Sequence, residues 1–236
     1  MPPDEDDDDT PDDHFLVMTR RRLGMTVCPA AARCHHRYAT GPKKGQVCGA
    51  ELDAHGYHAL TCPTGFSRKK RHDGIRDWVA ETCQECTGAG AETEQRVPEW
   101  DKLNPRTGVV EEAILDVATR DARTGAPMYV DVVVTCEHSA DAVRLRSRAN
   151  RDGAANEEAA NEKRRRYPDT QGRLQPFPLE TGGRVGDEVA SMLRSWGERN
   201  SGAGDAPLTT SKLWKQLSVK LQMGVAECIL SAIGPR

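Results

Sequence analysis

Apolar residues recur at helical spacing in three parts of the chain. Ile75, Trp78, Val79 and Cys83 predict an amphipathic helix over residues 71–86, which Gly88 and Gly90 would end. A second helix is predicted from residue 185 to 196. The last stripe steps by four residues, through Leu213, Leu217, Leu221, Val225 and Ile229, and predicts a long helix over 211–233.

Shorter apolar runs predict strands. They cover residues 94–97, 114–118, 128–135 and 177–181. The turn signal Thr124-Gly125 lies between the second and third runs, so residues 113–135 are expected to form a β-hairpin.

The remaining segments carry weaker patterns. Residues 140–166 are polar and predict one long helix that Gly153 weakens and Pro168 stops, and residues 15–27 predict a short helix or strand. No internal repeat is found. This order of elements predicts an α/β fold in which helices flank a mixed sheet.

Domain boundaries follow from composition. We expect a disordered acidic tail over 1–14, a Cys- and His-rich region over 15–66, a core over 67–199, a Gly/Ser/Pro-rich linker over 200–210 and a C-terminal helix over 211–236. The Cys- and His-rich region has little hydrophobic periodicity, so a bound metal is expected to hold it together.

Composition narrows the class of protein. The chain has 236 residues, of which 29% are charged and 5% aromatic, which suits one sizeable soluble domain. No apolar run is long enough to span a membrane, and the acidic N-terminus does not resemble an export signal. Eight cysteines in such a chain favour metal binding or free thiols over disulfides.

The net charge of −3 conceals an asymmetry, because residues 1–14 contain eight acidic residues and no basic one. The rest of the chain is net positive. Its basic clusters lie at residues 20–22, at Arg68, Lys69, Lys70 and Arg71, and at residues 163–166. Such clusters suit a polyanionic partner, although each one is also compatible with an ordinary solvated surface.

Four residues of the Cys- and His-rich region form the best zinc-ligand set: Cys34, Cys48, His58 and Cys62. Thiolate and imidazole are the ligands that Zn²⁺ prefers, and four protein ligands indicate a structural site. Cys28 is an alternative to Cys34 as first ligand. The pair Cys83 and Cys86 falls on a predicted helix and is interpreted as packing, as are Cys136 and Cys228.

A second set consists of acids on adjacent strands with a lysine after them. Asp116 and Asp131 come together if the strands at 114–118 and 128–135 pair, and Lys163 ends the following helix. Carboxylates bind Mg²⁺, and a nearby lysine can orient or deprotonate the attacking water. Tyr167 could donate a hydrogen bond to a phosphate, and Arg166 could neutralise its charge.

Taken together, these stretches resemble the restriction-like endonuclease domain (PD-(D/E)xK-like, with a CCHC zinc motif) of site-specific non-LTR retrotransposon polyproteins. The resemblance covers roughly residues 15–233. Its more specific stretches are Cys48-Gly-Ala-Glu-Leu-Asp53, Gly56-Tyr-His-Ala-Leu-Thr-Cys62 and Arg71-His-Asp73; weaker ones are Leu115-Asp-Val117, Tyr129-Val-Asp-Val-Val-Val-Thr135, Lys163-x-x-Arg-Tyr167 and Phe177-Pro-Leu-Glu-Thr-Gly182.

The resemblance implies a nuclear, Mg²⁺-dependent endonuclease that nicks double-stranded DNA, with a restriction-endonuclease-like core. It assigns structural Zn²⁺ to the Cys/His set, catalytic Mg²⁺ to Asp116 and Asp131, a displaced catalytic lysine to Lys163 with Tyr167 beside it, and a place near DNA to Arg71 and His72. Retrotransposon RNA or a reverse transcriptase acting in trans are further expected partners.

Two departures from the family pattern support an alternative. Leu115 stands where the family usually has proline before the first acid, and the residues ahead of position 15 leave no room for a polymerase. We therefore expect a fragment of a longer polyprotein or a freestanding descendant. The alternative function is a catalytically inactive, zinc-containing DNA-binding module, and a structural interaction protein is a third, weaker interpretation.

Overall fold

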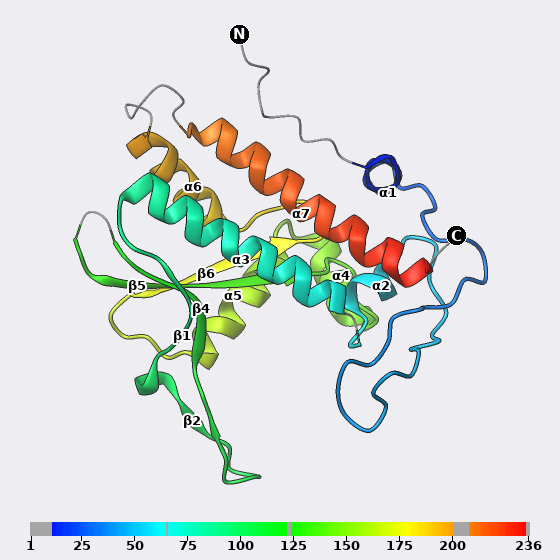
Figure 1. The fold of residues 1–236 in the computed structure, drawn as a ribbon, viewed down its shortest axis with the longest axis horizontal. Helices are drawn as coiled ribbons and strands as arrows, with labels where there is room; N and C mark the ends of the chain where they lie inside the picture. Colours follow the sequence, from blue (N-terminus) through cyan, green and yellow to red (C-terminus); the bar gives the residue numbers. More distant parts are fainter. Residues whose placement is uncertain (1–10, 65, 122–123, 201–207, 235–236) are drawn as a thin grey trace. The chain divides into compact units, whose positions relative to one another are not determined.

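A computed structural model describes residues 11–64, 66–121, 124–200 and 208–234. Figure 1 shows the elements in chain order. The helices are α1 (Asp12–Arg22), α2 (Tyr57–Thr61), α3 (Phe66–Thr87), α4 (Ala142–Asn150), α5 (Ala154–Arg166), α6 (Asp187–Asn200) and α7 (Thr210–Ile233), with a 3-10 turn at Pro98–Trp100. The strands are β1 (Glu92–Arg96), β2 (Lys102–Leu103), β3 (Val110–Glu111), β4 (Ile114–Arg120), β5 (Pro127–Thr135) and β6 (Leu174–Glu180).

The chain forms two compact units. One contains residues 1–71 and 221–236, and the other contains residues 72–220. The boundaries fall inside α3 and α7. No helix within the described residues is long and apolar enough to cross a membrane.

The larger unit is built on a mixed four-stranded sheet in the order β1-β4-β5-β6 (Figure 1). β4 pairs antiparallel with β1 and β5, which confirms the predicted hairpin, and β5 pairs parallel with β6. A parallel pair needs a crossover connection, which α4 and α5 supply. Pro176 and Pro178 are tolerated in β6 because it is an edge strand.

Helices flank this sheet. α5 packs on β5 and β6, and α6 packs on β6. Cys83 of α3 contacts Thr119 of β4 at 3.6 Å, so the predicted apolar stripe of α3 faces the sheet. The core of the unit consists of fully buried side chains, each of which stabilises the fold by about 1.5–3 kcal/mol: Ile75, Val79, Leu115, Val117, Val130, Phe177, Leu179 and Leu193.

In the smaller unit, the second half of the α7 stripe supplies much of the core. Leu221, Val225 and Ile229 are fully buried. Gly56 shows how closely the chain packs on this stripe. Its φ is +74°, in the left-handed region, and a Cβ there would lie 3.0 Å from Ile229.

Three expectations about local structure need correction or restriction. The predicted single helix over 140–166 is wrong: Gly153 adopts a left-handed φ of 72°, which separates α4 from α5. The acidic tail is shorter than expected, because α1 begins at Asp12 and Val17 is buried. Residues 1–10 of that tail and residues 201–207 of the expected linker lie outside the described residues.

Candidate functional site

The four predicted zinc ligands of the smaller unit converge. The ligand atoms of Cys34, Cys48, His58 and Cys62 all lie within 4.8 Å of one another. The Sγ atoms of Cys34 and Cys62 are 3.8 Å apart, and Cys48 Sγ is 3.5 Å from His58 Nε2. A tetrahedral zinc with ordinary bond lengths requires about 3.8 Å between two sulfurs and about 3.6 Å between sulfur and nitrogen. These two distances match a tetrahedral zinc site, and the cluster could hold such a metal.

Local backbone pairing places the two cysteines of the first half. The Cys34 N–H donates to Ala50 O at 2.8 Å, and the Cys48 N–H donates to His36 O at 2.7 Å. Directly after Cys48, Gly49 has a φ of +66°, a left-handed turn that glycine adopts without strain. The two thiols are thus carried on a short paired loop.

A carboxylate places the other half of the cluster. Asp53 accepts the backbone N–H groups of His55, Tyr57 and His58 at 2.8–3.0 Å, which fixes the start of α2. His58 and Cys62 follow at helical spacing. Cys62 Sγ also lies 3.0 Å from Thr64 Oγ1, which can donate a hydrogen bond to a thiolate. Such outer contacts orient ligands for a metal.

The choice between Cys28 and Cys34 is decided by position, because Cys34 belongs to the cluster and Cys28 does not. Burial, together with the neighbouring Cys62, raises the pKa of Cys34 to about 12. A cation would reverse this, since a metal stabilises the thiolate that burial disfavours. Cys83, Cys86, Cys136 and Cys228 are buried outside the cluster, as expected for packing residues.

In the larger unit, the two predicted acids meet where β4 and β5 separate. At this end, the β4–β5 ladder stops at the pair Val117 and Val130. Asp116 and Asp131 occupy the facing positions just beyond that pair. Here the Asp116 carboxylate, rather than a β4 carbonyl, accepts the Val132 N–H at 2.7 Å. Asp116 and Asp131 lie close enough that each influences the pKa of the other.

The predicted lysine reaches this pair from α5. Lys163 Nζ lies 2.7 Å from Asp131 Oδ2, and the Asp131 side chain is only 3% exposed. Gly153 contributes to this contact indirectly. Its left-handed conformation ends the α4 segment and begins α5 in a new direction, in which α5 packs on β5. The structure thus brings together Asp116, Asp131 and Lys163 from three separate elements.

The pKa values of the two carboxyl groups are shifted in opposite directions. Burial raises the pKa of Asp131 to about 6; the charge of Asp116 adds to this rise and Lys163 opposes it. Burial also acts on Asp116, but hydrogen bonds from His72 and Val132 outweigh it and lower the pKa. At neutral pH the pair is therefore an anionic, closely spaced site that a cation would stabilise.

His72 belongs to this acidic site, whereas the sequence suggested a place near DNA. His72 Nε2 is 3.2 Å from both Asp116 Oδ2 and the Val132 carbonyl oxygen. Because a carbonyl only accepts, Nε2 must carry a proton. Burial lowers the pKa of His72, but the contact with Asp116 outweighs burial and raises it. Its spacing from Ile75 and Val79 was a usable signal, because all three fall on the apolar face of α3.

Tyr167 and Arg166 lie at the end of α5. The Tyr167 ring is buried in a cluster with Trp100 and Leu115, and its hydroxyl accepts a hydrogen bond from Arg166 Nε at 3.2 Å. Arg166 is about half exposed, with Glu111 3.8 Å away. Tyr167 therefore packs in the core of the unit and also caps the C-terminal end of α5, the helix that carries Lys163.

The remaining predicted nucleic-acid contacts separate by exposure. Arg68, Lys69 and Lys70 are exposed at the start of α3. Arg71 is only 6% exposed, and a side chain on Gly224 would lie 2.5 Å from its Cγ. This burial argues against a direct phosphate contact for Arg71.

Comparisons of the chain with models of known protein families and with curated proteins found no match.

Proposed function

We propose that this protein is a divalent-metal-dependent endonuclease that nicks double-stranded DNA. The observation that carries the proposal is the meeting of Asp116, Asp131 and Lys163, with Lys163 Nζ 2.7 Å from Asp131 Oδ2. Two acids and a lysine from separate elements suit phosphodiester hydrolysis, which requires both charge neutralisation and an activated water.

The donor set fits Mg²⁺. This ion is commonly held by one or two carboxylates and keeps its other positions for water and substrate phosphate. Asp116 and Asp131 offer such a pair, because they occupy facing positions on β4 and β5 just beyond the last ladder pair, Val117 with Val130. When bound, Mg²⁺ would polarise the scissile phosphate and acidify a coordinated water.

The chain's own residues would support that chemistry. Asp116, held by His72 and the Val132 N–H, keeps one carboxylate oriented toward the opening between β4 and β5. Lys163 is half-buried and contacts Asp131, and loss of that contact to a metal would leave its ammonium group to orient the attacking water. Arg166 stands on the same helix, where it can neutralise phosphate charge.

Further features support the same proposal. A mixed sheet with acids on the neighbouring strands β4 and β5 and a lysine on α5 is compatible with a restriction-endonuclease-like core. The zinc-sized Cys/His cluster agrees with the CCHC motif of retrotransposon endonuclease domains. We extend the proposal to origin from such an element, to a nuclear location, and to element RNA or a reverse transcriptase as partners in trans.

One observation favours the inactive DNA-binding module as a second candidate. Among the described residues, the Cys/His cluster is the group in which three or more possible metal ligands converge. The acidic site offers two carboxylates. A chain could retain the zinc-dependent fold and its basic surface after losing cleavage.

The deciding experiment is a plasmid-nicking assay on purified, zinc-loaded protein with Mg²⁺ or Mn²⁺. Wild type should convert supercoiled plasmid to open circles, Asp131→Ala should abolish nicking, and Lys163→Ala should slow it strongly. The matched control is Asp152→Ala, because the Asp152 side chain is 93% exposed. If wild type and Asp131→Ala are equally inactive but bind DNA, the binding module replaces the nuclease.

A further inference from the structure

A groove of about 730 Å³ lies in the larger unit between β5, α4 and α5. Four arginines line it, and we name it the arginine groove after them: Arg144, Arg148, Arg164 and Arg165. Its lining also includes the apolar residues Val133, Val134 and Ala159. The groove contains two acids, Glu158 and Glu162, and therefore two more cationic than anionic side chains.

The groove continues directly from the acidic site. Val133 and Thr135 follow Asp131 at alternate positions of β5, so the three side chains share one face of the sheet. On α5, Glu162 and Arg164 flank Lys163. At about 3.3 Å per residue, Thr135 lies about 13 Å along the strand from Asp131, which equals about four nucleotide steps along a DNA helix axis.

The arginines are held in different ways. Arg148 is anchored: it donates to the Cys136 carbonyl at 2.7 Å and to Glu158 at 2.7 Å, and its side chain is 11% exposed. Arg144 is 60% exposed and approaches Glu158 at 3.5 Å. Arg165 is also exposed, and its backbone carbonyl accepts from Lys102. Arg144 and Arg165 thus present guanidinium groups that can reach an anion in the groove.

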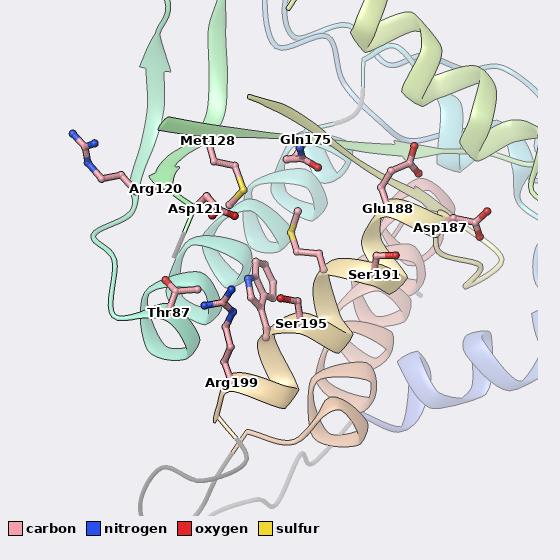
Figure 2. Close-up of a pocket in the computed structure, with 12 residues that line it drawn as sticks. Thr87, Arg120, Asp121, Met128, Gln175, Asp187, Glu188, Ser191, Ser195 and Arg199 are labelled. Carbon is pink, nitrogen blue, oxygen red and sulfur yellow. The ribbon is translucent and has the colours of Figure 1, made fainter. Parts of the chain in front are cut away.

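Another hollow of the same unit has a different character. It has a volume of about 580 Å³ and is lined on one side by Arg120 and Arg199 and on the other by Asp187 and Glu188 (Figure 2). Met128, at the opposite end of β5 from Thr135, lies between them. Asp121 also lines this hollow, so three acids face two arginines and a polyanion gains no net attraction there, which makes this hollow a suitable comparison.

We propose that the arginine groove binds the phosphodiester backbone of the DNA strand that leads away from the scissile phosphate. The inference rests on the proposed function, because the groove gains its meaning from its continuity with Asp131 and Lys163. Arginine is suited to this role, since its planar guanidinium can bind a phosphate through two hydrogen bonds. The apolar lining residues would contact the sugars, and Arg148 would keep the wall of α4 in place.

The test measures DNA binding without cleavage. The affinity of the double variant Arg144→Ala/Arg165→Ala for a duplex is determined without divalent metal, across a series of salt concentrations. Loss of two phosphate contacts should lower the slope of log affinity against log salt by about 2. The control is Arg194→Ala/Arg199→Ala, two exposed arginines of α6 in the same unit, which should leave the slope unchanged. Circular dichroism verifies that both variants are folded.

A rescue variant separates charge from packing. Arg144→Lys/Arg165→Lys keeps both charges and should restore most of the slope, whereas a slope that stays low would point to a loss of structure and overturn the proposal. An unchanged slope in the alanine variant, or wild type that binds no DNA, would also overturn it. If the alanine variant loses affinity as expected while wild type nicks no plasmid with any metal, the groove stands and the nuclease does not.

Discussion

The carboxylate of Asp116 accepts the backbone N–H of Val132 at 2.7 Å, in the position that a β4 carbonyl would occupy in a regular ladder. A side chain has replaced a strand hydrogen bond, so the two strands can separate without leaving this N–H unsatisfied. The separation gives Asp116 and Asp131 the space to face the same point, and His72 enters the same opening from α3.

His72 should act as a positioning residue for Asp116. Replacement by leucine removes the donor to the Val132 carbonyl and to Asp116, which should cost about 1–3 kcal/mol of stability. It should also raise the Mg²⁺ concentration needed for half-maximal nicking, because Asp116 would lose its orientation. His72→Gln, which retains a side-chain N–H donor, should recover most of the metal affinity. Equal metal dependence in all three proteins would contradict this role.

Zinc should be structural and close to one ion per chain. Cys62→Ser should lose the metal, as measured by elemental analysis of protein purified without chelators, because four ligands converge on one position. The matched control is Cys28→Ser: Cys28 is also buried and close in sequence but lies outside the cluster. Hydrogen exchange should show that chelation exposes residues 28–66. Zinc-free wild type would remove the hypothesis.

Two helical glycines should respond to alanine with opposite signs. A Cβ on Gly197 would lie 2.3 Å from the backbone nitrogen of Thr210, so Gly197→Ala should lower the melting temperature. Nothing lies within 4 Å of a Cβ on Gly74, so Gly74→Ala should stabilise α3 by about 0.5–1 kcal/mol. Thermal unfolding followed by circular dichroism measures both. Stabilisation by Gly197→Ala would contradict the close approach of α6 to Thr210.

Asp169 should contribute stability that depends on pH. Burial alone would raise the pKa of Asp169, but hydrogen bonds from the Leu174 and Gln171 N–H groups outweigh it and lower the pKa. A lowered pKa means that the folded state binds the proton less readily than the unfolded state. The stabilisation is therefore present above the unfolded pKa of about 4 and is lost as the pH falls through the folded value.

Urea unfolding at several pH values tests this contribution. At pH 7, Asp169→Asn should destabilise the protein by about 1–2 kcal/mol, and the difference from wild type should shrink as the pH falls below about 4. Asp152→Asn serves as the control, because its side chain is 93% exposed and should be neutral throughout. A difference that stays constant down to pH 2 would refute the assignment.

Features that depend on local pattern follow from the amino-acid sequence alone. The apolar stripes of α3 and α7 and the apolar runs of β4 and β5 specify these elements, because period and propensity act over a few neighbouring residues. The residue types of the Cys/His set also predicted a cluster that the structure confirms. Gly153 was visible as a weak point, but whether a glycine bends or breaks a helix depends on what each half packs against.

Tertiary structure decided everything that depends on distances between remote residues. Cys34, and not Cys28, belongs to the cluster because backbone pairing of its loop places the Cys34 thiol beside the other ligands. The spacing of cysteines along the chain does not determine which thiol is placed there. His72 reaches Asp116, 44 residues away, because α3 crosses β4 where the strands separate. Each of these contacts depends on how whole elements pack, and packing is a property of the complete set of buried side chains rather than of any one segment.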